Sequence, residues 1–338
     1  MTETRAARPR TRPIAVVAVS AVSLLGALFL AVSFGTEPVS IARAVSDASS
    51  FDHRALFDVR LPRALLGALA GAGLAGVGVA LQTVLRNPLA EPYMLGVSGG
   101  AALGATCVIA AGATTASVLG ASLVPLAALA GGVGATLLVY AFARAGSGSG
   151  GAHILLAGVI VNAICGALIT LVKTLVTASK AQELLFWLMG FLEVPPPALL
   201  GFVAFYAALG LAILLVDAGR LNVLALGEEP ARHLGVDVGR LERRTLLACS
   251  LVVGAITSAT GLIGFVGLVV PHALRRVVGP DTRVLLPASI LGGASVLVLC
   301  DLAGRLTFRA LHTEPPVGAV TALLGGPIFL LILRKSRT

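Results

Sequence analysis

Charged residues are scarce in this chain. They make up 12% of its 338 residues, whereas hydrophobic residues make up 57%. Because about a quarter of the residues in a soluble domain are charged, this composition predicts a polytopic, all-α integral membrane protein. The formal net charge of +9 does not indicate nucleic-acid binding, since no basic run is long or interleaved with aromatic residues. The positive-inside rule of membrane proteins explains the excess of positive charge better.

An ATP-binding signature is also lacking. The sequence contains no Gly-x-x-x-x-Gly-Lys-Ser/Thr motif, and its lysines, Lys173, Lys180 and Lys335, never follow a glycine. This absence excludes a P-loop in the chain, so we expect no ATP hydrolysis and no enzymatic activity of its own. The apolar runs hold almost no Asp or Glu, and an ion-coupled secondary transporter usually needs such residues at mid-membrane. A stand-alone secondary transporter is therefore the alternative and not the first hypothesis.

No pattern indicates a metal or catalytic site. The cysteines lie far apart in apolar runs, as small core residues do, and the histidines lie in predicted loops, at helix ends or in one broken span. The cysteines are Cys107, Cys165, Cys249 and Cys300, and the histidines are His53, His153, His233, His272 and His312. We therefore predict no catalytic residue, no metal site and no cofactor in this chain.

Long apolar runs are what the sequence does contain. A helix needs about 20 apolar residues to span a membrane, and we identify ten candidate spans. They are 14–34, 62–83, 93–112, 117–143, 153–172, 198–217, 244–262, 263–278, 284–302 and 317–333. We predict a basic tail at 1–13 and a single ten-helix transmembrane domain over 14–338, with a cytoplasmic segment at 218–243.

The distribution of basic residues predicts the orientation. With the N-terminus inside, 17 of the 25 Lys and Arg residues fall on the cytoplasmic side, in agreement with the positive-inside rule. Both termini are then cytoplasmic, and the protein is a multi-pass protein of the cell membrane. Arg60, Arg63 and Arg305 fall outside, so they either have another task or snorkel to the lipid headgroups. Asp301, four residues before Arg305, predicts a local ion pair.

The 218–243 segment is a charged island in an apolar chain. Between Asp217 and Arg244 lie 10 of the chain's 41 charged residues. The pattern predicts two short helices, 221–226 and 229–234, the second with Pro near its start and Gly just after its end. Helices of about six residues are unstable alone in water, so they must dock on another surface. Since the chain has no P-loop and few membrane carboxylates, we predict a permease driven by a separate ATPase that binds this segment.

Seven ordered motifs make the sequence recognisable. They are Arg-Leu-Pro-Arg (60–63), Arg-Asn-Pro-Leu-Ala-Glu-Pro (86–92) followed by Leu-Gly-Val-Ser (95–98), Leu-Leu-Ala-Gly-Val (155–159), Phe-Trp-Leu-Met-Gly (186–190), Leu-Ala-Leu-Gly-Glu (224–228), Gly-Phe-Val-Gly-Leu-Val-Val-Pro-His (264–272) and Pro-Val-Gly-Ala-Val-Thr-Ala-Leu-Leu-Gly-Gly-Pro (316–327). With these motifs the chain resembles the FecCD-type permeases, the membrane subunits of ABC importers for iron–siderophore complexes, haem and vitamin B12. One departure is the Pro that follows Glu314, where the family more often has Leu.

The resemblance implies a fold, partners and a class of cargo. It implies a ten-helix subunit like the vitamin B12 importer permease, which pairs with a second copy or a paralogue around a central path. It also implies two ATPase subunits, which bind ATP and magnesium, and an extracytoplasmic substrate-binding protein. For the cargo we expect an iron(III)–siderophore-type chelate, because that cargo is the family's commonest. Haem and cobalamin stay open as alternatives.

The resemblance further implies three groups of site residues. Arg60, Arg63 and Arg305 are expected to dock acidic residues of the binding protein. The coupling segment is expected to place leucines in a groove of the ATPase and charges at its rim. Its residues are Leu221, Asn222, Leu224, Leu226, Gly227, Glu228, Glu229, Pro230, Arg232, Leu234 and Gly235. The expected path and gate residues are Asn87, Pro88, Leu89, Gly151, Ala152, Asn162 and Thr170, and Lys173 is expected either to face the path or to snorkel.

Overall fold

The computed structural model describes residues 13–113, 117–118, 121–145 and 151–334, and nearly all of them are helical. The α-helices are α1 (Pro13–Ser33), α2 (Ile41–Ser46), α3 (Phe51–His53), α4 (Leu61–Val84), α5 (Val97–Ala110), α6 (Leu123–Ala145), α7 (Gly151–Leu175), α8 (Ala178–Met189), α9 (Pro197–Leu224), α10 (Glu228–His233), α11 (Val238–Thr260), α12 (Val266–Val278), α13 (Thr282–Leu311) and α14 (Val317–Arg334). A π-helical turn η1 (Arg54–Arg60), a 3-10 turn η2 (Pro92–Leu95) and a small antiparallel hairpin of β1 (Ser117–Val118) and β2 (Ala121–Ser122) complete the described elements. The predicted all-α fold class is confirmed.

Each predicted span overlaps a helix of the structure. In chain order these helices are α1, α4, α5, α6, α7, α9, α11, α12, α13 and α14. Within the described residues, six helical stretches are long and apolar enough to cross a membrane, and α5 and α14 contain shorter apolar helices. The predicted multi-pass membrane protein is thus confirmed, whereas the number of ten crossings stays a prediction. The predicted tail at 1–13 lies almost wholly outside the described residues.

Several helix boundaries differ from the predicted ones. Helix α9 continues without a break to Leu224, so the predicted separate helix at 221–226 is wrong and its first residues are the last turn of α9. Helix α11 begins at Val238, well before the predicted 244, and α8 occupies a predicted loop. Helix α6 begins at Leu123, after the β1–β2 hairpin. A hydropathy pattern marks only the apolar part of a helix, whereas backbone hydrogen bonds continue through polar residues beyond the membrane.

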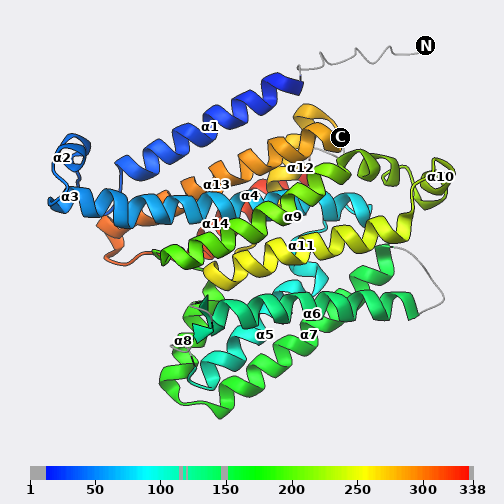
Figure 1. Cartoon of the computed structure of the whole chain (residues 1–338), viewed down its shortest axis with the longest axis horizontal. Coiled ribbons are helices and arrows are strands. Elements are labelled where there is room, and N and C mark those ends of the chain that lie inside the picture. Colours follow the sequence, from blue (N-terminus) through cyan, green and yellow to red (C-terminus); the bar gives the residue numbers. More distant parts are fainter. Residues whose placement is uncertain (1–12, 114–116, 119–120, 146–150, 335–338) are drawn as a thin grey trace.

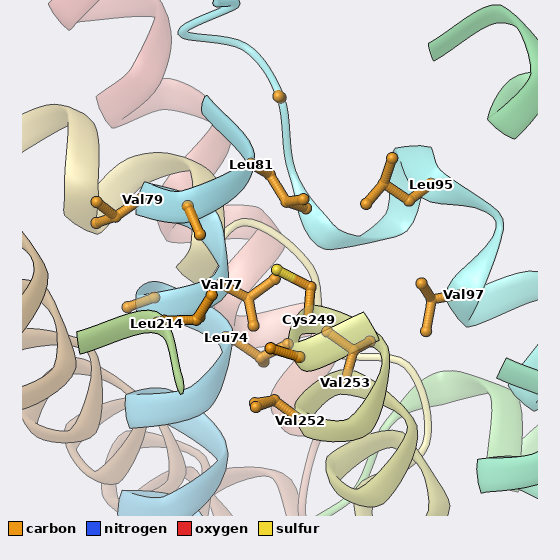
Figure 2. Close-up of a cluster of buried hydrophobic side chains, with 14 of the residues drawn as sticks. Leu74, Val77, Val79, Leu81, Leu95, Val97, Leu214, Cys249, Val252 and Val253 are labelled. Carbon is orange, nitrogen blue, oxygen red and sulfur yellow. The ribbon is translucent and has the colours of Figure 1, made fainter. Parts of the chain in front are cut away.

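Helix α4 lies at the centre of the bundle. In the helical stretch that contains it, 78% of the most apolar window is buried, against 17% in α7. Its side chains, among them Leu74, meet Leu214 of α9 and Cys249 of α11 in a buried cluster (Figure 2). Close backbone contact completes this packing, since a methyl group on Gly78 would lie 1.9 Å from the carbonyl oxygen of Gly267 in α12. Small residues allow such contacts between membrane helices.

The bundle has two distinct ends. Helices α2 and α3 lie at one end of its long axis and α10 lies at the other (Figure 1). Helix α1 runs along the bundle toward the α2 end. Because Arg60 belongs to η1, directly after α3, and the 218–243 segment surrounds α10, the two predicted docking regions lie at opposite ends of the molecule.

Candidate functional site

Two buried arginines hold the end of α1. Arg60 is 6% exposed and Arg305 is 4% exposed, and both donate hydrogen bonds to main-chain carbonyl oxygens. The acceptors for Arg60 are Val32 and Ser33, each at 3.0 Å, and Glu37, and the acceptors for Arg305 are Ala31 at 3.0 Å and Phe34 at 3.4 Å. The last carbonyls of a helix have no partner within the helix, and a cation there also interacts favourably with the helix dipole. The two arginines therefore fix the end of α1 and the turn after it.

Asp301 joins Arg305 to a third arginine. It pairs with Nε of Arg305 at 3.0 Å, so the predicted local ion pair is confirmed. The structure adds Arg63, whose Nη2 lies 2.9 Å from Asp301 and 2.9 Å from Glu314. Each carboxylate in this largely buried cluster thus has a cation beside it, as a buried charge requires.

A pocket of about 390 Å³ opens beside this cluster. Arg54, Arg60, Arg63 and Arg305 all line it, and the side chain of Arg54 is exposed. The structure therefore brings the three predicted docking arginines together and adds Arg54, which the sequence analysis does not single out. We call this group of four residues the arginine pocket. Its position at the α2 end suits the predicted docking role, which stays a prediction.

At the other end, the coupling segment is tied to the bundle by Asp217 and Asn222. Buried Asp217 pairs with Arg220 at 2.8 Å and with Arg244 of α11 at 3.0 Å. The Asn222 amide donates to Asp281 at 2.6 Å, and its oxygen accepts from the main-chain N–H of Thr282 at 2.7 Å. These contacts join the end of α9 to the beginnings of α11 and α13.

The leucines of the segment divide into two groups. Leu221 and Leu224 are fully buried within the chain, so the prediction that they fill a groove on a partner is wrong for this structure. Leu226 and Leu234 are 69% and 65% exposed. Leu221 and Leu224 lie on the inward face of the last turn of α9, whereas Leu226 and Leu234 lie beyond that helix. Of the other predicted coupling residues, Glu229, Pro230, Arg232 and Gly235 are exposed.

Glu228 connects α10 to the end of α4. It begins α10 directly after Gly227, whose φ of +125° favours glycine. Its Oε1 accepts a hydrogen bond of 2.9 Å from Nη2 of Arg86, and its Oε2 lies 3.6 Å from Arg232. The sequence analysis places Arg86 in a motif but assigns it no role. The only available signal is its position beside the predicted gate residues Asn87, Pro88 and Leu89.

The residues after Arg86 form a compact turn. Leu89 donates its N–H to Oδ1 of Asn87 at 2.9 Å, and Ala90 donates to the carbonyl of Asn87 at 3.0 Å. Pro88 and Leu89 are exposed, and Asn87 is half-buried. The predicted gate residues thus lie together, close in the chain to the partner of Glu228.

Asn162 of α7 is hydrogen-bonded to the main chain at both ends of its amide group. Its Oδ1 accepts from the N–H of Gly99 at 3.2 Å, and its Nδ2 donates to the carbonyl of Tyr93. These groups flank the break between η2 and α5, where main-chain groups lack their helical partners. The amide of Asn162 therefore satisfies main-chain groups at this break, and its expected place on the path stays a prediction.

The other predicted path residues lie on α7, which has a wide uncovered face. Thr170 is exposed and donates its hydroxyl to the carbonyl of Gly166 at 2.9 Å. Gly151 is the first residue of α7, Ala152 is exposed, and Lys173 lies in the last turn. Large apolar residues along α7, among them Leu156, Ile160, Ile164 and Leu171, are exposed by half or more. A lipid or protein neighbour is needed to cover this face.

Within the described residues, no group of three His, Cys, Asp or Glu side chains is placed to hold a metal ion. The expectation that this chain has no metal or cofactor of its own stays a prediction.

The sequence pattern of the FecCD transport family matches residues 23–335. The chain belongs to the FecCD transport family. This FecCD permease is 45% identical over 276 residues to the cobalamin import system permease protein BtuC of Halobacterium salinarum, across 82% of this chain and 72% of the relative. It is 38% identical over 289 residues to the hemin transport system permease protein HmuU of Yersinia pestis, across 83% of each chain. A solved structure described as a metal-chelate type ABC transporter in an inward-facing conformation matches with a TM-score of 0.84 and 30% identity, across 95% of this chain and 99% of that one.

Membership of the family identifies the class of protein. The chain is a permease of an ABC importer, and a permease of this class works with ATPase and binding-protein partners. The resemblance drawn from the seven motifs is confirmed. The family does not fix the cargo, because its relatives carry the names of different cargoes.

Proposed function

We propose that this FecCD permease moves a metal chelate into the cytoplasm and that separate ATPase subunits hydrolyse the ATP. The observation that carries this proposal is the placement of the arginine pocket and of α10 at opposite ends of one bundle. A chain without a P-loop needs a partner to supply energy, and α10 presents a surface for it. The α10 end is then cytoplasmic and the α2 end extracytoplasmic, with both termini inside.

For the cargo, cobalamin is the first candidate and an iron(III)–siderophore complex is the second. The sequence-based expectation of a siderophore rests on how common that cargo is in the family. The similarity to permeases named for cobalamin and haemin supports a bulky metal-centred macrocycle instead. All three cargoes are metal chelates too large for a narrow ion pore.

The arginine pocket is the proposed dock for the binding protein. Arg54 is exposed, and the Arg63 side chain is 18% exposed, so both can bind carboxylates of the binding protein. Arg60 and Arg305 donate hydrogen bonds to the end of α1 and form part of the pocket wall. Charge-assisted Arg–carboxylate pairs supply register between the two proteins.

The ATPase is proposed to bind α10 and the residues beside it. Leu226 and Leu234 offer apolar surface, and exposed Glu229 and Arg232 offer charges that fix the register. Two such permeases, or one with a paralogue, would place two α10 helices on two ATPase subunits. The uncovered face of α7 is proposed to meet the second permease across the path, with Thr170 and Lys173 near it.

Reconstitution tests the whole proposal. The permease, its ATPase and its binding protein are placed in proteoliposomes, and uptake of cyanocobalamin, haemin and ferrichrome is measured with and without internal ATP. ATP-dependent uptake of one chelate is expected, and uptake that needs the ATPase excludes a stand-alone transporter. Uptake by the permease alone, driven by an ion gradient, would overturn the proposal in favour of a secondary transporter.

A further inference from the structure

The chain reverses direction at Arg86 with unusual backbone geometry. Arg86 has a φ of +49°, and it follows the C-cap of α4. The N–H of Asn87 bonds to the carbonyl of Gln82 at 3.2 Å, and the N–H of Arg86 bonds to that of Thr83 at 3.3 Å. This is the Schellman arrangement, in which the left-handed position is usually glycine. An arginine at a position that favours glycine suggests that its side chain makes an interaction that a glycine could not make.

The side chain of Arg86 contacts α10. Helix α10 lies between α9 and α11 in the chain and packs on both. The pair between Arg86 and Glu228, 2.9 Å long and 142 residues apart in sequence, connects it to the end of α4 as well. The side chains of Arg86 and Glu228 are 40% and 16% exposed, and a partly buried pair is screened by salt less than a surface pair.

Both ends of this pair are held by further local contacts. Glu228 is the first residue of α10, and its second oxygen faces Arg232. Arg86 belongs to the capped end of α4, and Asn87 next to it closes the 86–90 turn through its side chain and its carbonyl. The ion pair therefore connects the start of α10 directly to the 86–90 turn.

We propose that the Arg86–Glu228 ion pair is the link through which α10 moves the 86–90 turn. Both are positioning residues: the pair touches neither nucleotide nor cargo, and it acts through the turn that carries Pro88 and Leu89. This inference rests on the proposed function, because it presumes an ATPase that displaces α10. It specifies the two residues that connect α10 to the end of α4, the central helix of the bundle.

The test measures the exposure of the turn. Leu89→Cys is introduced into a Cys107→Ala background, since Cys107 is the exposed cysteine of the described residues and the other three are buried. The complex with its ATPase and binding protein is placed in nanodiscs. The labelling rate by a maleimide–polyethylene glycol is then compared without nucleotide and after trapping with ATP and vanadate.

The link predicts a specific pattern in this reporter. Trapping is expected to change the labelling rate of the reference complex by about tenfold, as a shift between two conformations does. Arg86→Gln and Glu228→Gln are each expected to reduce that change in labelling rate below about twofold while the ATPase stays bound. The charge swap Arg86→Glu with Glu228→Arg is expected to restore at least half of the change. Restoration by the swap attributes the effect to the ion pair, as in a double-mutant cycle. The control is Arg240→Gln. Among the described residues Arg240 pairs with Asp237, three residues away, and its side chain is 77% exposed, so the full change in labelling rate is expected.

Two results separate this inference from the proposed function. If the reference complex changes with nucleotide and both neutral variants change equally, the link is wrong and the function stands. If the reference shows neither a nucleotide-dependent change nor ATP-dependent uptake, the proposed function itself fails. If Arg86→Gln lowers the yield of complex, the labelling of the Glu228→Gln complex alone tests the link, because Glu228 lies at a helix start outside the core.

Discussion

Arg63 and Asp301 lie 238 residues apart in sequence, yet Nη2 of Arg63 donates a hydrogen bond of 2.9 Å to Oδ1 of Asp301. This contact joins the first turn of α4 to the far half of α13. Asp301 also holds Arg305, which in turn holds the end of α1. One carboxylate thus organises three helices around the arginine pocket, so the shape of that pocket depends on it.

Removing the charge of Asp301 is expected to destabilise the protein. Asp301→Asn leaves Arg63 and Arg305 without their shared carboxylate, and breaking a buried ion pair costs about 3 kcal/mol. Thermal unfolding in detergent measures this loss. Asp58→Asn, an exposed acid of the same pocket wall, is the control and is expected to change little. Equal effects of the two substitutions would show that Asp301 does not organise the cluster.

Neutralising Arg54 is expected to weaken docking of the binding protein without loss of stability. Arg54→Gln removes an exposed charge from the pocket, and a rim charge is worth up to about tenfold in association. Surface binding of the purified binding protein at low and high salt measures the effect. Arg43→Gln, an exposed arginine of α2 that does not line the pocket, is the matched control. Equal docking by the Arg54→Gln and Arg43→Gln proteins would reject the pocket as the docking site.

Arg60 is expected to behave differently from Arg54. Arg60→Gln leaves the carbonyls of Val32 and Ser33 without their donor, and a buried unsatisfied group costs about 1–3 kcal/mol. Thermal stability is therefore expected to fall together with docking. A pure docking defect with unchanged unfolding would mean that the cap on α1 contributes nothing.

Leu226 and Leu234 are expected to bind the ATPase, whereas Leu224 is expected to hold the fold. Leu226→Ser and Leu234→Ser remove exposed apolar surface, so each is expected to lower ATPase association by about tenfold with little change in stability. Leu224→Ser places a hydroxyl in the core and is expected to lower the melting temperature. Pull-down and thermal unfolding, measured side by side, separate the two effects. If the ATPase binds the Leu226→Ser and Leu234→Ser proteins as tightly as the unchanged protein, its contact lies elsewhere on the permease.

Gly78→Ala is expected to disrupt the bundle. The added methyl group would lie 1.9 Å from the carbonyl oxygen of Gly267, so α4 and α12 must separate, at a cost of about 1–3 kcal/mol or more for overpacking. Gly201→Ala on α9 has nothing within 4 Å of the added methyl and is expected to be neutral or slightly stabilising. Thermal unfolding and gel-filtration profiles compare them. A well-folded Gly78→Ala protein would contradict the close approach.

Much of the helical framework could be predicted because hydropathy acts locally. A membrane helix must satisfy its backbone within itself, so an apolar run marks its position wherever the rest of the chain lies. The ends could not be predicted as well, since α9 carries on through Arg220 to Leu224 and α11 begins at Val238. Those polar turns are stabilised by contacts such as Asp217 with Arg244, which no local pattern encodes.

The candidate sites divide in the same way. A motif located Arg60 and Arg63, and local charge with a motif located the coupling segment, because such patterns are read from neighbouring residues; Arg305 was indicated by the resemblance to the family. They gave no indication that Arg60 and Arg305 cap α1, that Leu221 and Leu224 point inward, or that Asn162 serves a helix break. These facts depend on which surfaces meet, and the partners are far apart in the chain.

The sequence by itself determined that this is a membrane protein, that it has no P-loop, and that it belongs with the FecCD permeases. Composition, apolar length and ordered motifs are sums over neighbouring residues, so no fold is needed to evaluate them. Only the tertiary structure decided that Arg63 meets Asp301 and that Arg86 meets Glu228. An ion pair requires its atoms within about 4 Å, and only packing of α4 against the rest of the bundle brings residues so distant in sequence to that separation.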